Sequence, residues 1–145
     1  MPGMFVLIVG AGRVGAAAAR SALAAGHEVS VLDDDPLSHE RLDAGQPTSW
    51  EDAGGRFTVG HGIEIEALLE AGIDRADLFI ASTHGDNTNL VIAQIAQRRF
   101  EIEHVIARVM DPARAAWYET QGLRTISPTR HAIEMFESAL TEITV

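Results

Sequence analysis

The sequence predicts an α/β protein whose core is a doubly wound, six-stranded parallel sheet. Three observations near the N-terminus carry this prediction. An unbroken apolar run, residues 4–9, is typical of a buried parallel strand and leads directly into the glycine turn GAGRVG at 10–15. An alanine-rich helical segment follows at 16–25. Residues 27–32 then alternate like a second strand that Asp33 closes, which completes the order of a Rossmann-like dinucleotide-binding unit.

Each glycine of this turn has a separate role in such a unit. Gly10 permits the tight turn out of the strand, and Gly12, which has no Cβ, lets a pyrophosphate approach the backbone. Gly15 allows the helix to pack close to the sheet. The first N–H groups of a helix have no intrahelical partners, and the helix dipole favours an anion beside them. The turn therefore predicts a phosphate-binding site.

The acidic residues after the second strand predict which nucleotides fit. The carboxylate of Asp33 can accept hydrogen bonds from ribose hydroxyls. Asp34 and Asp35 add negative charge that repels the 2′-phosphate of NADP, and no basic residue directly follows the strand. NADP is therefore disfavoured, whereas NAD, NADH, ATP, ADP and AMP stay open as ligands.

The composition of the 145-residue chain is that of a soluble globular domain, with 46% hydrophobic residues and no cysteine. Its net charge of −10 argues against a nucleic-acid partner, because phosphates would be repelled by most of the surface. Every apolar run is shorter than a membrane span, and the N-terminal run lacks the basic flank of a signal peptide. A cytoplasmic location is therefore expected.

The rest of the chain continues the alternation of strands and helices, with an irregular segment at 44–56. Strands are expected at 57–59, 77–82, 105–109 and 123–126, and helices at 37–42, 63–71, 86–99 and 112–120. Ligands of such sheets bind at the carboxyl ends of the strands, across the point where strand order reverses. Besides the glycine turn, the expected lining is Asp33, Asp34, His61, Gly62, Ser82, Thr83, Asn87 and Arg108.

The last helix is predicted to begin at Pro128 with Ser127 as its N-cap. Its apolar residues fall on one face at helical spacing: Ala132, Ile133, Phe136, Ala139, Leu140 and Ile143. Such a stripe needs a partner. The helix either folds back on its own sheet or packs against a second copy of the chain.

Six short segments carry a resemblance to a known family: GHEV (26–29), VLDDDP (31–36), AGIDRAD (71–77), GDNTN (85–89), ARVMDP (107–112) and GLRTISP (122–128). In order and spacing they resemble the TrkA-N domains, also called RCK or KTN domains. Members of this family are cytosolic regulatory subunits of bacterial potassium channels and transporters. The chain is most similar to the short, single-lobe type, so residues 1–145 are expected to form one N-lobe, without the second lobe of longer members.

The resemblance implies roles for the matching positions. Arg13, next to Val14 in the glycine turn, matches an arginine that reaches the terminal phosphates of ATP across a dimer interface. Arg108 matches a basic residue that faces the phosphates, and from the residues alone it also fits a structural ion pair with Asp111 or Glu119. The loop residues Ser82, Thr83 and Asn87 match the segment below the ligand, and from the residues alone they also fit ordinary capping of the next helix.

Two positions depart from the family pattern. Where relatives often carry an acidic residue near the adenine amino group, this chain has His61 between Gly60 and Gly62. Where nucleotide-gated relatives carry a Glu that helps to hold a divalent cation, this chain has Thr129. The second departure argues against a cation-bridged ATP state, and no metal ligand is assigned.

The resemblance and the motifs together favour a nucleotide-binding gating subunit of a bacterial potassium uptake system. The subunit would be a homodimer or larger ring on the cytoplasmic face of a membrane transporter. One alternative is a small NAD-dependent oxidoreductase. All eleven basic residues are arginine, so a Tyr-x-x-x-Lys catalytic pair is excluded. A second alternative is a stand-alone nucleotide sensor.

Overall fold

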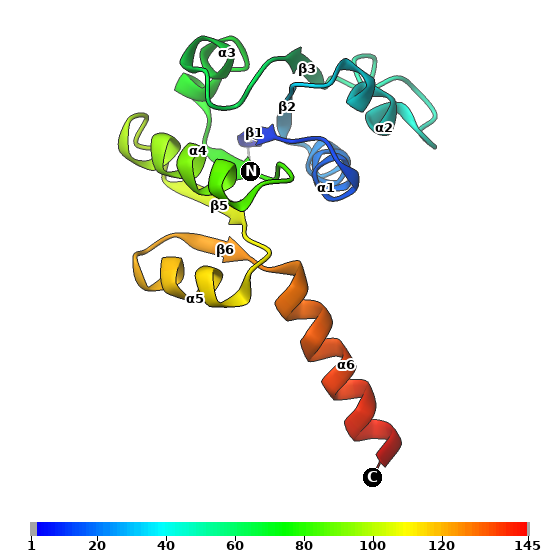
Figure 1. Cartoon of the computed structure of the whole chain (residues 1–145). Coiled ribbons are helices and arrows are strands. Elements are labelled where there is room, and N and C mark those ends of the chain that lie inside the picture. The colour runs from blue at the N-terminus through cyan, green and yellow to red at the C-terminus, as the bar shows by residue number, and fades with distance from the viewer. Residues whose placement is uncertain (1–2, 145) are drawn as a thin grey trace.

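The computed structural model describes residues 3–144, and these form a six-stranded parallel sheet with helices on both faces (Figure 1). The strand order is β3-β2-β1-β4-β5-β6, so the order reverses between β1 and β4. Every neighbouring pair in the sheet is parallel. The doubly wound sheet predicted from the sequence is confirmed. The strands are β1 Phe5–Val9, β2 Glu28–Asp33, β3 Arg56–Val59, β4 Leu78–Ala81, β5 His104–Arg108 and β6 Arg124–Ile126.

Two groups of helices cover opposite faces of the sheet (Figure 1). Helices α1 and α2 pack against one face with the buried side chains of Ala16, Ala19 and Leu42. Helices α3, α4 and α5 pack against the other through Leu68, Ile92 and other apolar residues. The helices are α1 Arg13–Ala24, α2 His39–Asp43, α3 Ile65–Glu70, α4 Asp86–Arg98, α5 Pro112–Thr120 and α6 Pro128–Thr144.

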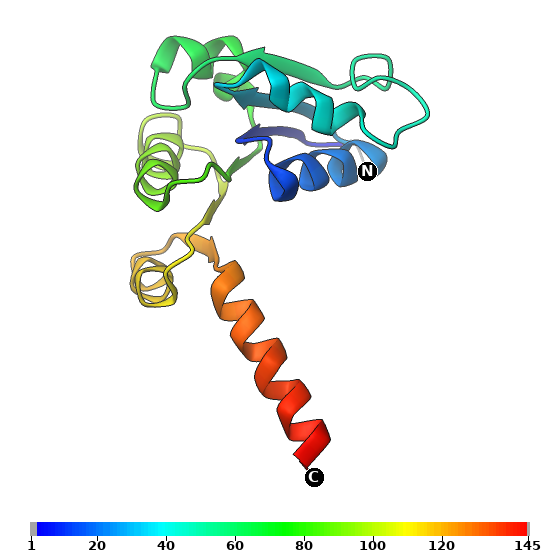
Figure 2. The ribbon, with the colours of Figure 1, turned by 45° about the vertical axis from the view of Figure 1, so that its right-hand side comes forward.

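Helix α6 extends away from the sheet and packs against neither face (Figures 1 and 2). The hydroxyl of Ser127 accepts a hydrogen bond from the backbone N–H of Arg130 at 3.2 Å, which confirms the predicted cap. Every residue from His131 to Thr144 is exposed, and Phe136 keeps 73% of its surface in contact with solvent. The helix therefore leaves its apolar stripe uncovered in the single chain.

The sheet is covered unevenly. All five residues of β1 are buried, whereas β4, β5 and β6 bury only alternate residues. On the less covered side, Leu78, Ile80 and Ile106 are half-buried and Ile126 is 45% exposed. Leu78 and Ile80 pack against the edge of the cluster that α1 and α2 cover, and the rest of this apolar half-face is less covered.

The expected helix at 37–42 is instead two short pieces. A 3₁₀ turn, Pro36–Ser38, precedes α2, because the Asp35 carboxylate accepts the N–H of Leu37 at 2.9 Å and Pro36 fixes the first position. The irregular segment before β3 is confirmed, and Trp50 anchors it. The buried indole donates a hydrogen bond to the carbonyl of Arg56 at 2.9 Å.

Other elements differ at their ends. Helix α3 starts two residues later than expected, at Ile65, and α1 starts three residues earlier than expected, at Arg13. A second 3₁₀ turn, Ile73–Arg75, was not predicted. It follows Gly72, whose φ of 99° ends α3 in the left-handed conformation.

Candidate functional site

A cleft of about 410 Å³ opens at the carboxyl ends of β1, β2 and β4, at the reversal of strand order. This is the position at which doubly wound sheets bind ligands. The cleft is lined by the glycine turn, the acidic segment after β2, part of α2 and the turns after β3 and β4: Val9, Gly10, Gly12, Leu32, Asp33, Asp34, Asp35, Ser38, Arg41, Gly60, His61, Gly62, Ile63, Ser82, Thr83, His84, Gly85 and Thr88.

The three glycines of the turn meet different surroundings. Gly10 has a φ of +103°, and a Cβ there would lie 2.5 Å from the carbonyl oxygen of Ser82. A Cβ at Gly15 would lie 1.9 Å from the carbonyl oxygen of Gly10. At Gly12 the nearest atom would be the His84 ring at 3.9 Å. Gly10 and Gly15 are therefore needed by the fold, whereas the space beside Gly12 is open toward the cleft.

The N-terminus of α1 is free to receive an anion. Its N-cap is Gly12, so no side chain caps the helix, and its first turn carries no acidic residue. Gly12 lies in the cleft lining. The positive end of a twelve-residue helix thus lies beside the cavity.

Asp33 is held in place by the backbone around it. Its Oδ2 accepts the N–H of Ala11 at 2.7 Å, and its Oδ1 accepts the N–H of Asp35 at 2.8 Å. A carboxylate has about four acceptor positions, so each oxygen keeps capacity for a further donor. The half-buried side chain therefore ties the glycine turn to the end of β2 and can still accept ribose hydroxyls.

A polar network fixes the turn after β4. The buried hydroxyl of Ser82 donates to the carbonyl of Gly10 at 3.0 Å. The buried amide of Asn89 accepts the N–H of Thr83 at 2.8 Å and donates to the carbonyl of Arg108 at 2.9 Å. The Arg108 guanidinium in turn donates to the carbonyl of Thr83. These hydrogen bonds connect the carboxyl ends of β1, β4 and β5 at the base of the cleft.

Eight of the predicted residues lie together in the cleft lining: Gly10, Gly12, Asp33, Asp34, His61, Gly62, Ser82 and Thr83. Five others do not line it. Gly15 is buried beneath the turn, while Arg13 and Val14 are exposed on the first turn of α1. Asn87 is exposed and accepts a hydrogen bond from Arg114 at 2.7 Å, and Arg108 lies behind Thr83.

The Nε of Arg108 is buried without a hydrogen-bond partner among the described residues. Its guanidinium is engaged with the carbonyl of Thr83 instead of an acidic side chain. The ion pair considered from the sequence, to Asp111 or Glu119, is absent from residues 3–144. Glu119 pairs with Arg130 at 2.9 Å.

Sequence reasoning missed Arg41, the arginine in the cleft lining. Its Nη1 lies 3.2 Å from the hydroxyl of Ser38 and 3.4 Å from the carbonyl of Ala11. Across the mouth, the ring of His61 lies 3.6 Å from the Asp34 carboxylate, and both side chains are exposed. The lining of the cleft thus contains the guanidinium of Arg41 and the carboxylates of Asp33, Asp34 and Asp35.

The comparisons agree with this geometry. The TrkA-N domain matches residues 6–128, which is most of the chain. The chain belongs to the TrkA-N family. A Trk system potassium uptake protein TrkA of Streptomyces coelicolor is 40% identical over 127 residues, which are 88% of this chain and 54% of that protein. A TrkA homolog of Methanothermobacter thermautotrophicus is 33% identical over 95% of this chain and 61% of its own length.

Solved structures with the same fold include the Shewanella denitrificans Kef C-terminal domain in its AMP-bound form. It aligns with a TM-score of 0.74 at 23% identity over 96% of this chain and 81% of that one. The GsuK channel bound to NAD aligns with a TM-score of 0.77 at 19% identity, over 97% of this TrkA-N chain and 24% of the channel. In residues 3–144 no helix is long and apolar enough to cross a membrane.

Proposed function

We propose that this TrkA-N protein is a nucleotide-binding regulatory subunit of a potassium uptake system, and not an enzyme. The observation that carries the proposal is the open cleft at the uncapped N-terminus of α1, in a chain 40% identical to a Trk system potassium uptake protein. The chain spans 54% and 61% of the lengths of the two relatives named above. The proposal includes a membrane partner and a place at the cytoplasmic face of the membrane. It also includes residues 1–145 acting as one functional lobe.

The ligand in this proposal is an adenine nucleotide. The open side of Gly12 leaves room for phosphates beside the N-terminus of α1, which no side chain caps, and Asp33 supplies acceptors for ribose hydroxyls. The AMP and NAD bound to proteins of the same fold support the same class. Asp33, Asp34 and Asp35 disfavour the additional phosphate of NADP.

A second copy of the chain would complete the assembly. The apolar stripe of α6 and the half-covered face of β4, β5 and β6 are both unpartnered within residues 3–144. An α6 helix that crosses to a second copy would bury apolar surface on both subunits. Arg13 supports this arrangement, because it is exposed at the rim and does not line its own cleft.

Gating would follow from a difference in nucleotide affinity between two arrangements of the dimer. Coupling free energies between sites are typically about 1–3 kcal/mol, which is enough to shift a balanced equilibrium strongly. Nucleotides that differ in phosphate charge would differ in their attraction to Arg13.

The test is a thermal unfolding panel of the purified chain with ATP, ADP, AMP, NAD, NADH and NADP. A ligand at a hundred times its dissociation constant adds about 2.7 kcal/mol of stability. For a domain of this size that raises Tm by roughly 5–10 °C. NADP is expected to give the smallest shift. In Arg13→Ala, the shift with ATP should fall more than the shift with AMP.

Two results would contradict the proposal. If none of the adenine nucleotides raises Tm, the cleft is not a nucleotide site. Turnover of NADH with a small carbonyl substrate would instead favour the oxidoreductase.

A further inference from the structure

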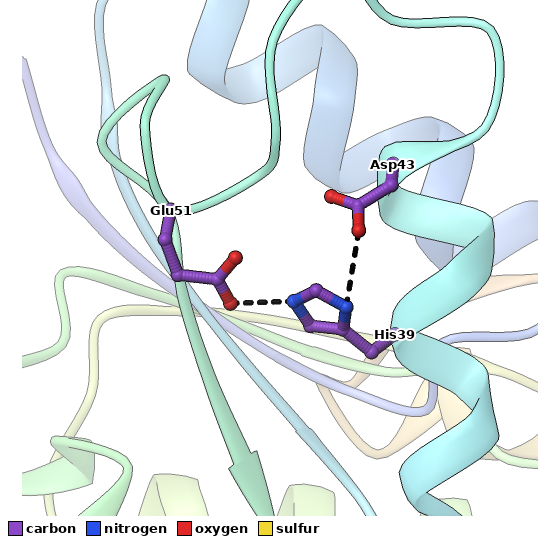
Figure 3. Close-up of side chains that lie close together, drawn as sticks. All are labelled: His39, Asp43 and Glu51. Carbon is purple, nitrogen blue, oxygen red and sulfur yellow. Dashed lines mark hydrogen bonds and ion pairs between the residues drawn. The ribbon is translucent and has the colours of Figure 1, made fainter.

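Three metal-ligating side chains meet where α2 faces the segment before β3, outside the nucleotide cleft (Figure 3). The Nδ1 of His39 lies 3.3 Å from an Asp43 oxygen, and its Nε2 lies 2.5 Å from a Glu51 oxygen. One ligand atom from each residue can be chosen so that all three lie within 4.8 Å of one another. We propose that this cluster binds a divalent transition-metal ion such as Zn²⁺.

The separation between His39 and Asp43 suits a shared ion. Zinc takes nitrogen and oxygen ligands at about 2.0–2.2 Å, which at a tetrahedral angle places two ligands roughly 3.4 Å apart. The observed 3.3 Å between Nδ1 and Oδ2 is close to that spacing. Glu51 then accepts the N–H of the opposite ring nitrogen, as a carboxylate does behind many metal-bound histidines. Water completes the coordination.

Aromatic neighbours contact two of the three groups. The second oxygen of Asp43 accepts the N–H of Trp50 at 2.7 Å, and Trp50 is only 2% exposed. Glu51 follows this anchored residue directly. The ring of His39 packs edge-on against Phe57 at 5.2 Å between centroids. The ligands are thus positioned by the fold, and the half-exposed cluster is open to ions from solvent.

The local charge also favours a dication. No arginine within residues 3–144 forms a salt bridge with Asp43 or Glu51, so no guanidinium competes with an ion for these two carboxylates. The net charge of −10 adds to the attraction. Imidazole together with carboxylates suits Zn²⁺, Ni²⁺ or Co²⁺ better than Mg²⁺, which prefers oxygen ligands alone.

The experiment is calorimetric titration of the untagged full chain with ZnCl₂, NiCl₂ and MgCl₂. One equivalent of Zn²⁺ or Ni²⁺ should bind, and Mg²⁺ should not compete. His39→Gln and Asp43→Asn should weaken Zn²⁺ binding at least about tenfold, and Glu51→Gln should weaken it less. Asn at position 43 keeps an oxygen for the N–H of Trp50, so its fold should persist.

The matched control is His131→Gln on α6, where an exposed histidine lies 3.9 Å from Glu134 without a third group. This variant should bind Zn²⁺ like the wild type. The proposal is overturned if the wild type binds no Zn²⁺, or if both histidine variants lose affinity equally. It is also overturned if Zn²⁺ raises the Tm of His39→Gln as much as that of the wild type, because the cluster is then an ion-pair network only.

Discussion

Gly12 and Gly15 are three residues apart in one turn, yet the space beside them differs. A methyl group at Gly15 would overlap the carbonyl oxygen of Gly10, whereas a methyl group at Gly12 would meet nothing closer than 3.9 Å. Gly15 is therefore needed by the fold, whereas Gly12 leaves open space that the phosphates of the proposed nucleotide would use. This distinction can be measured.

Gly15→Ala should lower the free energy of unfolding by about 1–3 kcal/mol, because the backbone must shift to accept the methyl group. Gly12→Ala should lower it by at most about 1 kcal/mol, the usual loss for alanine at an N-cap. Gly12→Ala should weaken nucleotide binding at least tenfold, or by about 1.4 kcal/mol. Urea unfolding and Tm shifts with nucleotide measure the two effects. If Gly12→Ala keeps a full Tm shift, the phosphates do not approach this position.

For single residues, the sequence predicted the position of those side chains that belong to a local motif. Asp33 could be found because it closes a strand at a known distance from the glycine turn. Arg41 could not, because it reaches the cleft from a five-residue helix that local sequence does not place, and whose last residue, Asp43, is hydrogen-bonded to Trp50. The structural role of Asn89 could not be predicted from the sequence. Its amide connects Thr83 with Arg108, and these two residues come together only in the folded sheet.

The carboxylate of Glu119 links α5, β6 and α6 at their junction. Hydrogen bonds from Thr125, at 2.5 Å, and from Arg130, at 2.9 Å, hold the pKa of Glu119 below its usual value. Since Arg130 lies in the first turn of α6, this carboxylate helps to set the direction in which the helix leaves the domain.

The lowered pKa of Glu119 predicts a pH dependence with a definite sign. The charged carboxylate stabilises the folded state above about pH 4.5, and this contribution is lost as the pH falls through the folded pKa. Glu119→Gln should therefore be less stable than the wild type at neutral pH, and the difference should shrink as the pH falls below about 4.5. Urea unfolding across this range tests it. A difference that stays constant with pH would mean that the charge is irrelevant.

Element boundaries followed local chemistry wherever caps and periodicity agreed. The helix predicted at 112–120 was confirmed without change, because Asp111 caps it and Pro112 starts it. The helix expected at 37–42 was wrong as a single element. There the Asp35 carboxylate and Pro36 favour a tight turn first, and packing decides where the α-helix begins.

For the whole molecule, the reversal of strand order and the position of the cleft followed from the alternation of strands and helices. The direction of α6 did not. An apolar stripe shows that a helix needs a partner, but the stripe is the same whether the partner is its own sheet or another chain. The structure excludes the first arrangement for this chain, since α6 packs on neither face (Figure 2).

A single charge on α6 should separate the copies of the proposed dimer. Phe136 lies on the apolar stripe, and its burial would contribute about 1.5–3 kcal/mol per subunit. Phe136→Asp should weaken association at least about a hundredfold, since loss from both subunits exceeds 2.7 kcal/mol. Light scattering after size exclusion measures the mass. Ser138→Asp, on the opposite face of the helix, should stay dimeric, and equal disruption by both variants would implicate helix unfolding.

The carboxylate of Asp33 accepts hydrogen bonds from the backbone of the glycine turn and of the segment after β2, so the fold itself fixes its position in the proposed nucleotide site. If the pocket needs no rearrangement to bind its nucleotide, binding causes little local movement that could be transmitted. The response must then come from the charge of the nucleotide where it reaches a neighbouring subunit. We therefore expect an isolated subunit to bind its ligand without a conformational change, and only the dimer to respond.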